Sequence, residues 1–361
     1  MIVKDEAHVI RRCIESVRPL IDSWVIVDTG STDGTQEVVR EALSDLPGEL
    51  HERPWRDFGH NRSEAIQLAK GVADYLLFID ADDSLEIPDD FRLPRLTEGA
   101  YEMTIQHGSL TYRRISLVDN ALPWRYAGVL HEYPACDVPY SRSQLDGGLH
   151  IHFGGDGGRS KINQAEKYAQ DAEVLERALS EDPDNPRHAF YLAQSYRDAG
   201  QPEKALAAYD HRATMGGFDQ ELYCALLEAA RLARQLLQPA ADVVHRYLRA
   251  HESRPSRAEA LGELAFYLRE NGERWPLAYL FAEKAIGLPP TDDVLFVGHE
   301  WYQWRCQDEY ATAAYWVGEY EKSRQACESL LRGSGLPAEQ RPRVTANLNF
   351  ALQRLGLPEV N

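Results

Sequence analysis

The sequence lacks the marks of secreted, membrane-spanning and zinc-binding proteins. Its five cysteines are scattered along 361 residues, and no two of them form a C-x-x-C pair. An odd number of separate cysteines indicates reduced thiols and argues against a disulfide framework. No apolar run reaches the roughly 18 residues that a membrane-spanning helix needs, and no charged-then-apolar signal peptide is recognisable. We therefore expect a cytoplasmic protein with no membrane span.

Positive charge is also scarce. The chain has 39 Lys and Arg residues against 57 Asp and Glu residues, which gives a formal net charge of −18. A surface this acidic repels phosphate backbones, so we expect no nucleic-acid partner. The hydrophobic share of 43% and the charged share of 27% are those of a folded globular protein, and the length allows two domains that each bury a core.

Strands and helices alternate in the first half of the chain. Helical spacing of apolar residues predicts a helix from Glu6 to Val17. An apolar run at residues 24–27 ends at Asp28, and another at residues 75–79 ends at the acidic segment 80–83. Further strands are predicted near residues 101–105, 112–118 and 149–153. This alternation predicts a mostly parallel sheet, whose ligands bind beyond the carboxyl ends of the strands, where both acidic segments lie.

The second half of the chain is helical and repetitive. Small residues at Ala193 and Ala205 and an aromatic residue at Tyr209 match the spacing of a tetratricopeptide helix pair. About three to five such pairs would fit the available length. The predicted domains are an α/β domain at 1–160, a connecting helix or linker at 161–186 and an all-α, TPR-like helical-repeat domain at 187–361.

Four segments of the first half occur in the order seen in one large enzyme family. They are residues 1–6, 27–35, 58–65 and 78–83, and the second of them, V-D-T-G-S-T-D-G-T, is the most specific. Together they resemble the inverting family 2 glycosyltransferases of GT-A fold, in the branch with C-terminal tetratricopeptide repeats. The resemblance covers roughly residues 1–161 and implies a Rossmann-like catalytic domain. Family members usually have a longer first strand, so either this strand is short or the true start lies upstream.

The resemblance implies a nucleotide site around the first two segments. Asp28 takes the position that recognises the uracil or an equivalent base in the family, and Asp5 and Glu6 would lie beside the nucleoside. The family more often has Asn in place of Asp5. Arg62 matches an arginine that lies against the nucleotide, with a surface ion pair as the structural alternative. Ser63 replaces the more usual Asn, so no role is carried over to it.

A metal site is expected where the chain reads Asp80-Ala81-Asp82. A leaving nucleoside diphosphate needs a divalent cation to balance its charge, and Mg²⁺ or Mn²⁺ prefers carboxylate oxygens. By resemblance Asp82 binds the metal, and Asp80 binds the metal or the ribose. His152 would complete the metal shell or touch the diphosphate. The structural alternatives are a solvated acidic turn and a hydrogen-bonded strand histidine.

The segment from Trp124 to Glu132 resembles the acceptor side of the family's site. Inverting transfer needs a carboxylate that deprotonates the acceptor hydroxyl. Glu132 is our candidate for this base, and His131 would orient it or touch the sugar. Asp137 is the competing candidate, and a purely structural role is the alternative for Glu132.

A glycine-rich segment, residues 154–161, follows the last predicted strand. It lacks the spacing of a phosphate-binding G-x-x-x-x-G-K-[ST] loop. So many glycines favour a mobile lid, with Arg159 and Lys161 able to close over the diphosphate. A plain flexible interdomain linker would explain the same composition.

The expected activity is transfer of a hexose or N-acetylhexosamine from a nucleotide sugar to a hydroxyl acceptor, with UDP as the expected nucleotide and Mn²⁺ or Mg²⁺ as cofactor. Helix-pair arrays form concave surfaces that hold extended peptides or build dimers. We therefore expect a protein or peptide acceptor, with a homodimer through the repeats as the other use of the array. The alternative function is a binding scaffold with an inactive transferase domain, against which the intact Asp28, Asp82 and Glu132 argue.

Overall fold

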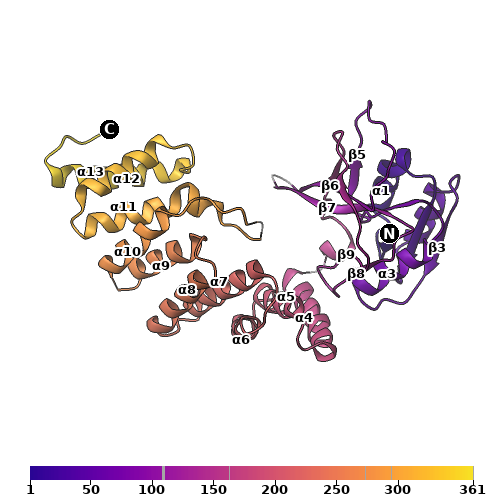
Figure 1. Cartoon of the computed structure of the whole chain (residues 1–361), viewed down its shortest axis with the longest axis horizontal. Helices are drawn as coiled ribbons and strands as arrows, with labels where there is room; N and C mark the ends of the chain where they lie inside the picture. The colour runs from indigo at the N-terminus through magenta and orange to yellow at the C-terminus, as the bar shows by residue number, and fades with distance from the viewer. Residues whose placement is uncertain (108–109, 162, 273, 294, 361) are drawn as a thin grey trace. The chain divides into compact units, whose positions relative to one another are not determined.

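The computed structural model of the chain describes residues 1–107, 110–161, 163–272, 274–293 and 295–360 (Figure 1). Its contacts define two compact units. The N-terminal unit consists of Met1–Pro183 and Asp198–Gly200, and the C-terminal unit consists of Asp184–Arg197 and Gln201–Asn361. Over the described residues, the first unit contains strands and helices and the second contains helices. The expected order, an α/β domain followed by an all-α repeat domain, is confirmed.

The described strands of the N-terminal unit form two sheets and a hairpin. The smaller sheet is parallel, has the order β1-β2-β3 and consists of β1 (Ile2–Val3), β2 (Trp24–Asp28) and β3 (Gly48–Glu52). The larger sheet has the order β4-β7-β6-β11-β5, with β10 on β6, and consists of β4 (Tyr75–Leu77), β5 (Ser84–Glu86), β6 (Ala100–His107), β7 (Leu110–Asp119), β10 (Arg142–Gln144) and β11 (His150–His152). The hairpin consists of β8 (Trp124–Ala127) and β9 (Tyr133–Cys136).

The larger sheet is mixed, which differs from the mostly parallel sheet that the sequence predicts. β6 and β7 are antiparallel neighbours because a short connection joins them, whereas parallel neighbours need a crossover of a dozen residues or so. β11 runs parallel to β6, but β4 on β7 and β5 on β11 are antiparallel. The prediction holds for the smaller sheet, where α1 (Ile10–Val17) and α2 (Thr35–Ala42) lie in the connections between strands.

α1 begins at Ile10, not at Glu6 as the apolar spacing predicts. Asp5 has a φ of +55°, which a helix does not contain. The N–H groups of Asp5 and Glu6 donate to Ser31 Oγ at 2.9 Å and Thr35 Oγ1 at 2.8 Å. These bonds tie the backbone ahead of α1 to the loop after β2, so the helix starts only beyond them. Its apolar face forms as predicted and buries Ile10, Cys13, Ile14 and Val17.

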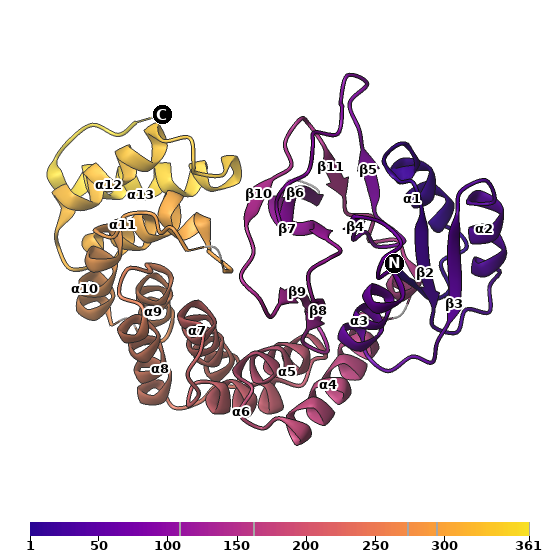
Figure 2. The same ribbon diagram turned by 45° about the vertical axis from the view of Figure 1, so that its right-hand side comes forward.

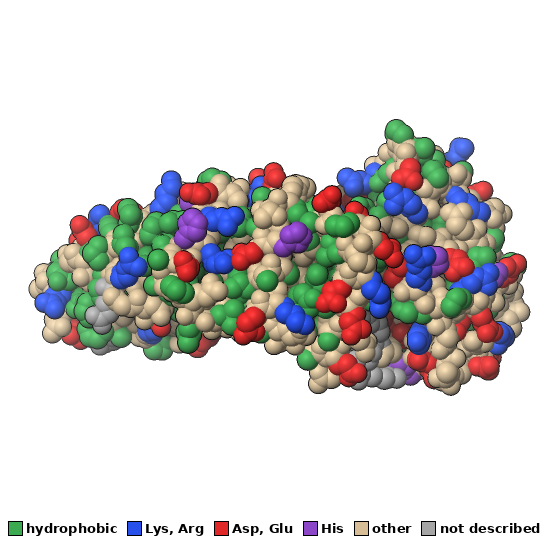
Figure 3. Space-filling model, turned by 90° about the horizontal axis from the view of Figure 1, so that it is seen from below, with side chains coloured by type: hydrophobic (Ala, Val, Ile, Leu, Met, Phe, Trp, Pro, Cys, Tyr) green, Lys and Arg blue, Asp and Glu red, His purple; other side chains and the backbone are tan. Residues whose placement is uncertain are grey.

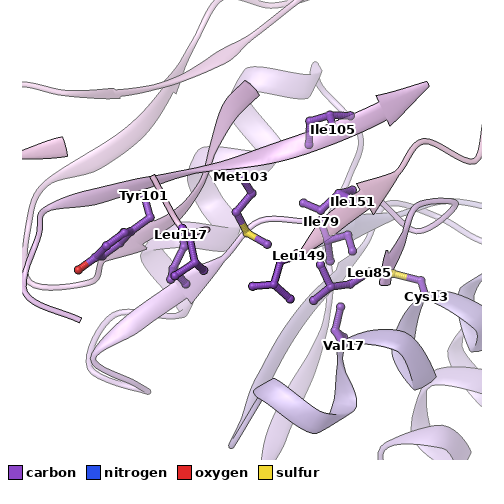
Figure 4. Close-up of a cluster of buried hydrophobic side chains, with 11 residues drawn as sticks. Cys13, Val17, Ile79, Leu85, Tyr101, Met103, Ile105, Leu117, Leu149 and Ile151 are labelled. Carbon is purple, nitrogen blue, oxygen red and sulfur yellow. The ribbon is translucent and has the colours of Figure 1, made fainter. Parts of the chain in front are cut away.

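The core beside the larger sheet contains side chains from β5, β6, β7, β11 and α1 (Figure 4). Met103, Ile105 and Ile151 have at most 1% of their surface exposed. Cys13 and Val17 belong to the same cluster, so α1 packs against this sheet next to β5. Because these side chains interdigitate without water, the cluster fixes the helix against the strands.

Two further helices complete the N-terminal unit. α3 (Phe58–Leu68) starts after Asp57, whose carboxylate accepts an N–H of the first turn and so caps the helix. It contacts β2 and β8. α4 (Gln164–Glu181) starts after Asn163, which caps it in the same way. By its contacts α4 belongs to the N-terminal unit, although it lies within the predicted connecting segment, residues 161–186.

The C-terminal unit is a stack of helices in which each helix from α6 onward packs against the next along the chain (Figure 2). Its helices are α5 (Pro186–Asp198), α6 (Pro202–Arg212), α7 (Asp219–Gln235), α8 (Ala240–Ser253), α9 (Glu259–Glu270), α10 (Trp275–Ile286), α11 (Cys306–Trp316), α12 (Tyr320–Arg332) and α13 (Arg341–Leu355). Ala193 and Ala205 are fully buried and Tyr209 is 1% exposed, as the repeat spacing predicts. Small residues at these positions let neighbouring helices approach closely.

The surface carries charges of both signs. On the face shown in Figure 3, Lys and Arg side chains lie among Asp and Glu side chains and do not form a continuous basic area over the described residues. Among the helices that the structure describes, none combines the length and the apolar character required to cross a membrane.

Replacing Ile105 by Ala should destabilise the N-terminal unit by about 2–5 kcal/mol, because the side chain is fully buried and its removal leaves a cavity. Urea denaturation followed by near-UV circular dichroism measures the change. Val138→Ala, at a position that is 40% exposed in the same unit, should change the free energy of unfolding by less than about 0.5 kcal/mol. Equal effects of the two substitutions would contradict the assignment of the core.

Candidate active site

Asp28 provides a buried acceptor at the end of β2. The residue is 1% exposed. Its Oδ1 accepts the N–H groups of Gly30 and Ser31, both at 2.8 Å, and these bonds shape the loop that leaves the strand. Gly30 has a φ of +106°, which favours glycine there. Oδ2 is also buried but accepts no hydrogen bond from any described residue. A buried carboxylate oxygen without a partner is suited to receive a donor N–H from a ligand.

Asp5 and Glu6 lie against the same loop. Asp5 Oδ1 accepts the Thr32 N–H at 2.8 Å, in addition to the backbone bonds that join residues 5 and 6 to the loop. Burial raises the pKa of Glu6, and the N–H of Gly158 opposes this shift. The structure therefore places Asp5, Glu6 and Asp28, three of the residues that the sequence predicts for donor binding, around one loop.

Asp80 follows β4 and is paired with two arginines. Its Oδ1 lies 2.5 Å from Nη2 of Arg62, and its Oδ2 lies 3.6 Å from Nη1 of Arg114. Burial by itself would raise the pKa of Asp80, but the two guanidinium groups outweigh it and lower the pKa to about 2. Asp80 is therefore ionised at neutral pH. Arg114 also pairs with the buried Asp83, at 3.1 Å.

Glu132 reaches the same arginine from the turn between β8 and β9. Its Oε1 lies 2.7 Å from Nε of Arg62, and only 12% of its side chain is exposed. Burial raises the pKa of Glu132, with Arg62 acting in the opposite direction. His131, just before it, has a φ of +50°, an uncommon conformation of the kind that collects at functional sites. Asp137, the competing base, is instead exposed and pairs with Arg125 at 2.9 Å.

Arg62 and the two carboxylates that it pairs with line a cavity of about 410 Å³. Its charged lining includes Arg62, Asp80, Arg114 and Glu132. Rings and apolar groups supply the rest, among them Phe58, Phe78, Tyr126, Leu130 and Phe153. Aromatic and apolar walls beside convergent charged groups are typical of small-molecule sites in proteins.

The sequence analysis missed the contribution of α4 to this cavity. Lys167, Tyr168 and Asp171 line it from the helix that was interpreted as a connection. Asp171 is 8% exposed. It lies four residues before Leu175 on the buried side of α4. An acidic residue on an otherwise apolar stripe is the signal in the sequence that could have indicated a polar site there. Arg114 was missed as well, since nothing in its local sequence distinguishes it.

Two family models match different parts of the chain. Residues 1–155 match Glycosyl transferase family 2, and residues 174–207 match a tetratricopeptide repeat family. The first part of the chain is thus similar to family 2 glycosyltransferases, and the part that follows is similar to tetratricopeptide repeats. The repeat match begins within α4, so the helix that lines the cavity is also where the repeat sequence starts.

The chain is similar to two curated bacterial proteins. A TPR repeat-containing protein of Synechococcus elongatus is 35% identical over 140 residues, which are 37% of this chain and 34% of that protein. The SPbeta prophage-derived glycosyltransferase SunS of Bacillus subtilis is 22% identical over 222 residues, which are 57% of this chain and 50% of that protein. The chain thus spans about a third to a half of the length of these relatives. Among solved structures, MamA is 15% identical with a TM-score of 0.35, over 55% of this chain and 94% of MamA.

The three predicted metal ligands do not form one shell in the N-terminal unit. Asp80 is held by arginines, and Nε2 of His152 lies 2.6 Å from a carboxylate oxygen of Glu86. Among the described residues, no group of three His, Cys, Asp or Glu side chains is arranged to hold a metal ion. Asp82 differs from its two companions, because its Oδ2 accepts the backbone N–H of Gly157 at 3.3 Å.

The glycine-rich segment after β11 lies against the acidic residues of this domain. The N–H of Gly154 donates to Asp83 at 3.3 Å, and the N–H of Gly158 donates to Glu6 at 3.1 Å. A Cβ on Gly154 would lie 1.8 Å from the carbonyl oxygen of Asp82, so only glycine permits this approach. Asp156 pairs with Arg12 of α1 at 2.7 Å. The side chains of Arg159 and Lys161 lie outside the described part of the structure, so their closure over a diphosphate stays a prediction.

Removing the guanidinium of Arg62 should destabilise the domain by about 3–5 kcal/mol, because Arg62→Ala leaves the carboxylates of Asp80 and Glu132 facing each other without this cation. Equilibrium urea unfolding at pH 7 measures the loss. Arg125→Ala breaks the exposed pair with Asp137 and should cost at most about 1 kcal/mol. A loss for Arg62→Ala no greater than that for the control would show that Arg62 does not organise the site.

Proposed function

We propose that the glycosyltransferase domain transfers a hexose or N-acetylhexosamine from a UDP-sugar to an acceptor hydroxyl with inversion of configuration. The observation that carries this proposal is the buried, unpartnered Oδ2 of Asp28 at the end of β2. Uracil presents an N–H that such an oxygen can accept. Asp5 and Glu6 lie in the adjoining loop, where a nucleoside bound to Asp28 would be within their reach.

A divalent cation, Mn²⁺ or Mg²⁺, is part of the proposal. Mg²⁺ in nucleotide sites is commonly held by one or two carboxylates together with substrate phosphates, so a single well-placed protein ligand suffices. Asp82 would hold the ion, and the ion would balance the charge of the departing diphosphate. Asp80 would not bind the ion and would instead hold the guanidinium groups of Arg62 and Arg114 in the cavity.

Glu132 is the proposed base. It lies in the cavity beside Arg62, whereas Asp137 is not among the residues that line it. In inverting transfer the base removes the proton of the acceptor hydroxyl on the face of the sugar opposite the leaving group. A pKa raised by burial strengthens the carboxylate as a base, because its conjugate acid holds the proton more firmly.

We further propose that the acceptor is a protein or peptide and that its hydroxyl enters the cavity past α4. Lys167, Tyr168 and Asp171 line that side, and the tetratricopeptide match starts in the same helix. Repeat arrays of this kind bind extended peptides, which would present the reacting residue to the cavity. The alternative role of the array is dimerisation through the repeats. We also propose that the protein is cytoplasmic.

Donor binding tests the proposal most directly. UDP-, GDP- and TDP-sugars are titrated into the protein with Mn²⁺ in a calorimeter, and we expect one of them to bind selectively. Asp28→Asn replaces the buried acceptor by an amide and should weaken binding by about 5- to 150-fold, the equivalent of about 1–3 kcal/mol. Asp82→Ala removes the proposed metal ligand and should abolish the part of donor binding that depends on Mn²⁺. Asp90→Asn, on the exposed turn after β5, is the matched control. If folded protein binds no donor, the scaffold function replaces the transferase.

Glu132→Gln should lower donor turnover, with water as the acceptor, by about 10²- to 10⁴-fold and leave donor affinity unchanged. Asp137→Asn should leave turnover intact, since this residue is exposed and outside the cavity. In the wild type, turnover should fall on the acid side at a pH above the ordinary carboxyl range, because burial raises the pKa of Glu132. The reverse pattern, with loss in Asp137→Asn alone, would transfer the base role to Asp137.

A further inference from the structure

The connection between α10 and α11 is longer than the packing of these two helices requires. It runs from residue 287 to residue 300, ahead of the helical turn Trp301–Arg305 that leads into α11, and the structure describes it at residues 287–293 and 295–300. In Figure 2 it is the orange loop that leaves the stack beside α11. Four residues are enough to join α7 to α8 in the same stack. A connection this long that forms no strand or helix over its described residues usually has a function of its own.

Part of this connection lies across the N-terminal ends of alternate helices. We call its residues 291–293 and 295–298 the strap. The N–H of Leu295 donates at 2.9 Å to Oε1 of Gln220, in the first turn of α7. The ring of Phe296 stacks on Phe190 of α5, with 6.3 Å between the ring centroids. The strap therefore reaches back to helices that precede it by about 70 to 110 residues in the chain.

Two arginines of the α8–α9 connection hold the strap by a carboxylate. Nε of Arg254 donates to Oδ2 of Asp293 at 2.5 Å, and Nη1 of Arg257 donates to the same oxygen at 3.2 Å. The side chain of Asp293 is only 4% exposed. Hydrogen bonds between ionised partners are about twice as strong as those between neutral groups, so Asp293 is the main anchor of the strap.

Side chains of the repeat helices and their connections also bind the backbone of the strap. Arg257 donates to the carbonyl oxygens of Leu295 and Phe296, at 3.2 Å and 3.1 Å. Sγ of Cys224, on α7, lies 3.7 Å from the same Leu295 oxygen. The N–H of Gly298 donates to the carboxylate of Glu259, the first residue of α9, at 3.0 Å. Contacts to the main chain of an extended segment are a common source of affinity in peptide recognition.

Phe296 is the least favourable part of the strap. Its φ is +45°, and the residue is 58% exposed although its ring lies on Phe190. Bulky residues rarely adopt a positive φ, and such a conformation persists only where the surroundings impose it. A separate segment with a relaxed, extended backbone could make the same polar contacts without this strain.

We propose that the N-terminal ends of α5, α7 and α9 form a peptide-binding site, which the strap occupies in the free protein and a segment of a partner protein occupies after displacing it. The partner segment is extended and carries an Asp or Glu side chain for Arg254 and Arg257. Three residues later it carries an aromatic side chain for Phe190. This composition copies the strap, in which Asp293 and Phe296 have the same spacing.

The inference goes beyond the proposed function and does not depend on it. Every residue named for this site belongs to the C-terminal unit. The strap competes with a partner as a tethered ligand, whose effective concentration is about millimolar. A partner therefore binds weakly unless it also relieves the strain of the strap or the anchor at Asp293 is weakened.

The test uses a fluorescent synthetic peptide with the sequence of residues 290–299, titrated into the full chain and followed by anisotropy. Asp293→Asn weakens the anchor of the strap and leaves both arginines in place. We expect this variant to bind the peptide more tightly than the wild type by about 10-fold or more, because the strap then competes less well. Asp292→Asn, at the exposed neighbouring residue, is the matched control and should bind like the wild type.

A second variant tests the recognition of the carboxylate. Adding Arg254→Ala to Asp293→Asn removes a guanidinium that the peptide carboxylate needs, so the gain in affinity should disappear. A peptide with Asn at the position that corresponds to Asp293 should likewise bind the Asp293→Asn chain no more tightly than the original peptide binds the wild type. Equal binding of the two peptides would contradict the proposed recognition.

Hydrogen exchange tests the displacement in the wild type, which needs no variant to fold. A saturating concentration of the peptide should speed the exchange of the Leu295 amide, since the peptide takes over its bond to Gln220. If the Leu295 amide is unaffected, or if the folded Asp293→Asn and Asp292→Asn chains bind the peptide alike, the strap is a fixed part of the fold and the proposal is overturned. No sugar donor is present in these experiments, so this inference and the proposed function fail separately.

Discussion

The guanidinium of Arg62 is the cation on which the arrangement of the active site depends. It lies on α3 and contacts Asp80 at 2.5 Å and Glu132 at 2.7 Å. Two carboxylates in one partly buried cavity repel each other unless a cation lies between them. The ring of Tyr126, 5.3 Å from the guanidinium carbon, supports the same group from β8. Ion pairs to this one guanidinium therefore connect helix α3, the segment after β4 and the β8–β9 hairpin.

Backbone N–H groups organise the neighbouring acidic residues. The loop after β2 donates to Asp28 and Asp5, and the glycine-rich segment after β11 donates to Glu6, Asp82 and Asp83. Each such bond stabilises a carboxylate without a counter-ion, which allows several acidic side chains to lie close together. The glycine at position 154 has a steric reason as well, because a Cβ there would collide with the backbone carbonyl of Asp82.

The sequence predicted the elements whose patterns are local and strong. The strand that ends at Asp28 and the acidic turn at residues 80–83 followed from apolar runs that stop at polar residues, and both lie where predicted. β3 (Gly48–Glu52) was missed, because its residues are mainly polar and partly exposed and give no apolar run. The start of α1 was predicted too early, since the bonds from Asp5 and Glu6 to the loop after β2 cannot be read from helical spacing.

The sequence by itself determined the two-part architecture, the similarity of the first domain to family 2 glycosyltransferases and the carboxylates at the ends of β2 and β4, because these follow from periodicity and from motifs of contiguous residues. Only the tertiary structure decided that Arg62 and Arg114 pair with Asp80, that His152 pairs with Glu86, and that α4 lines the active-site cavity. These are contacts between residues far apart in the chain. Their existence depends on the register of β7 and β11 and on the packing of α3, which local sequence does not encode.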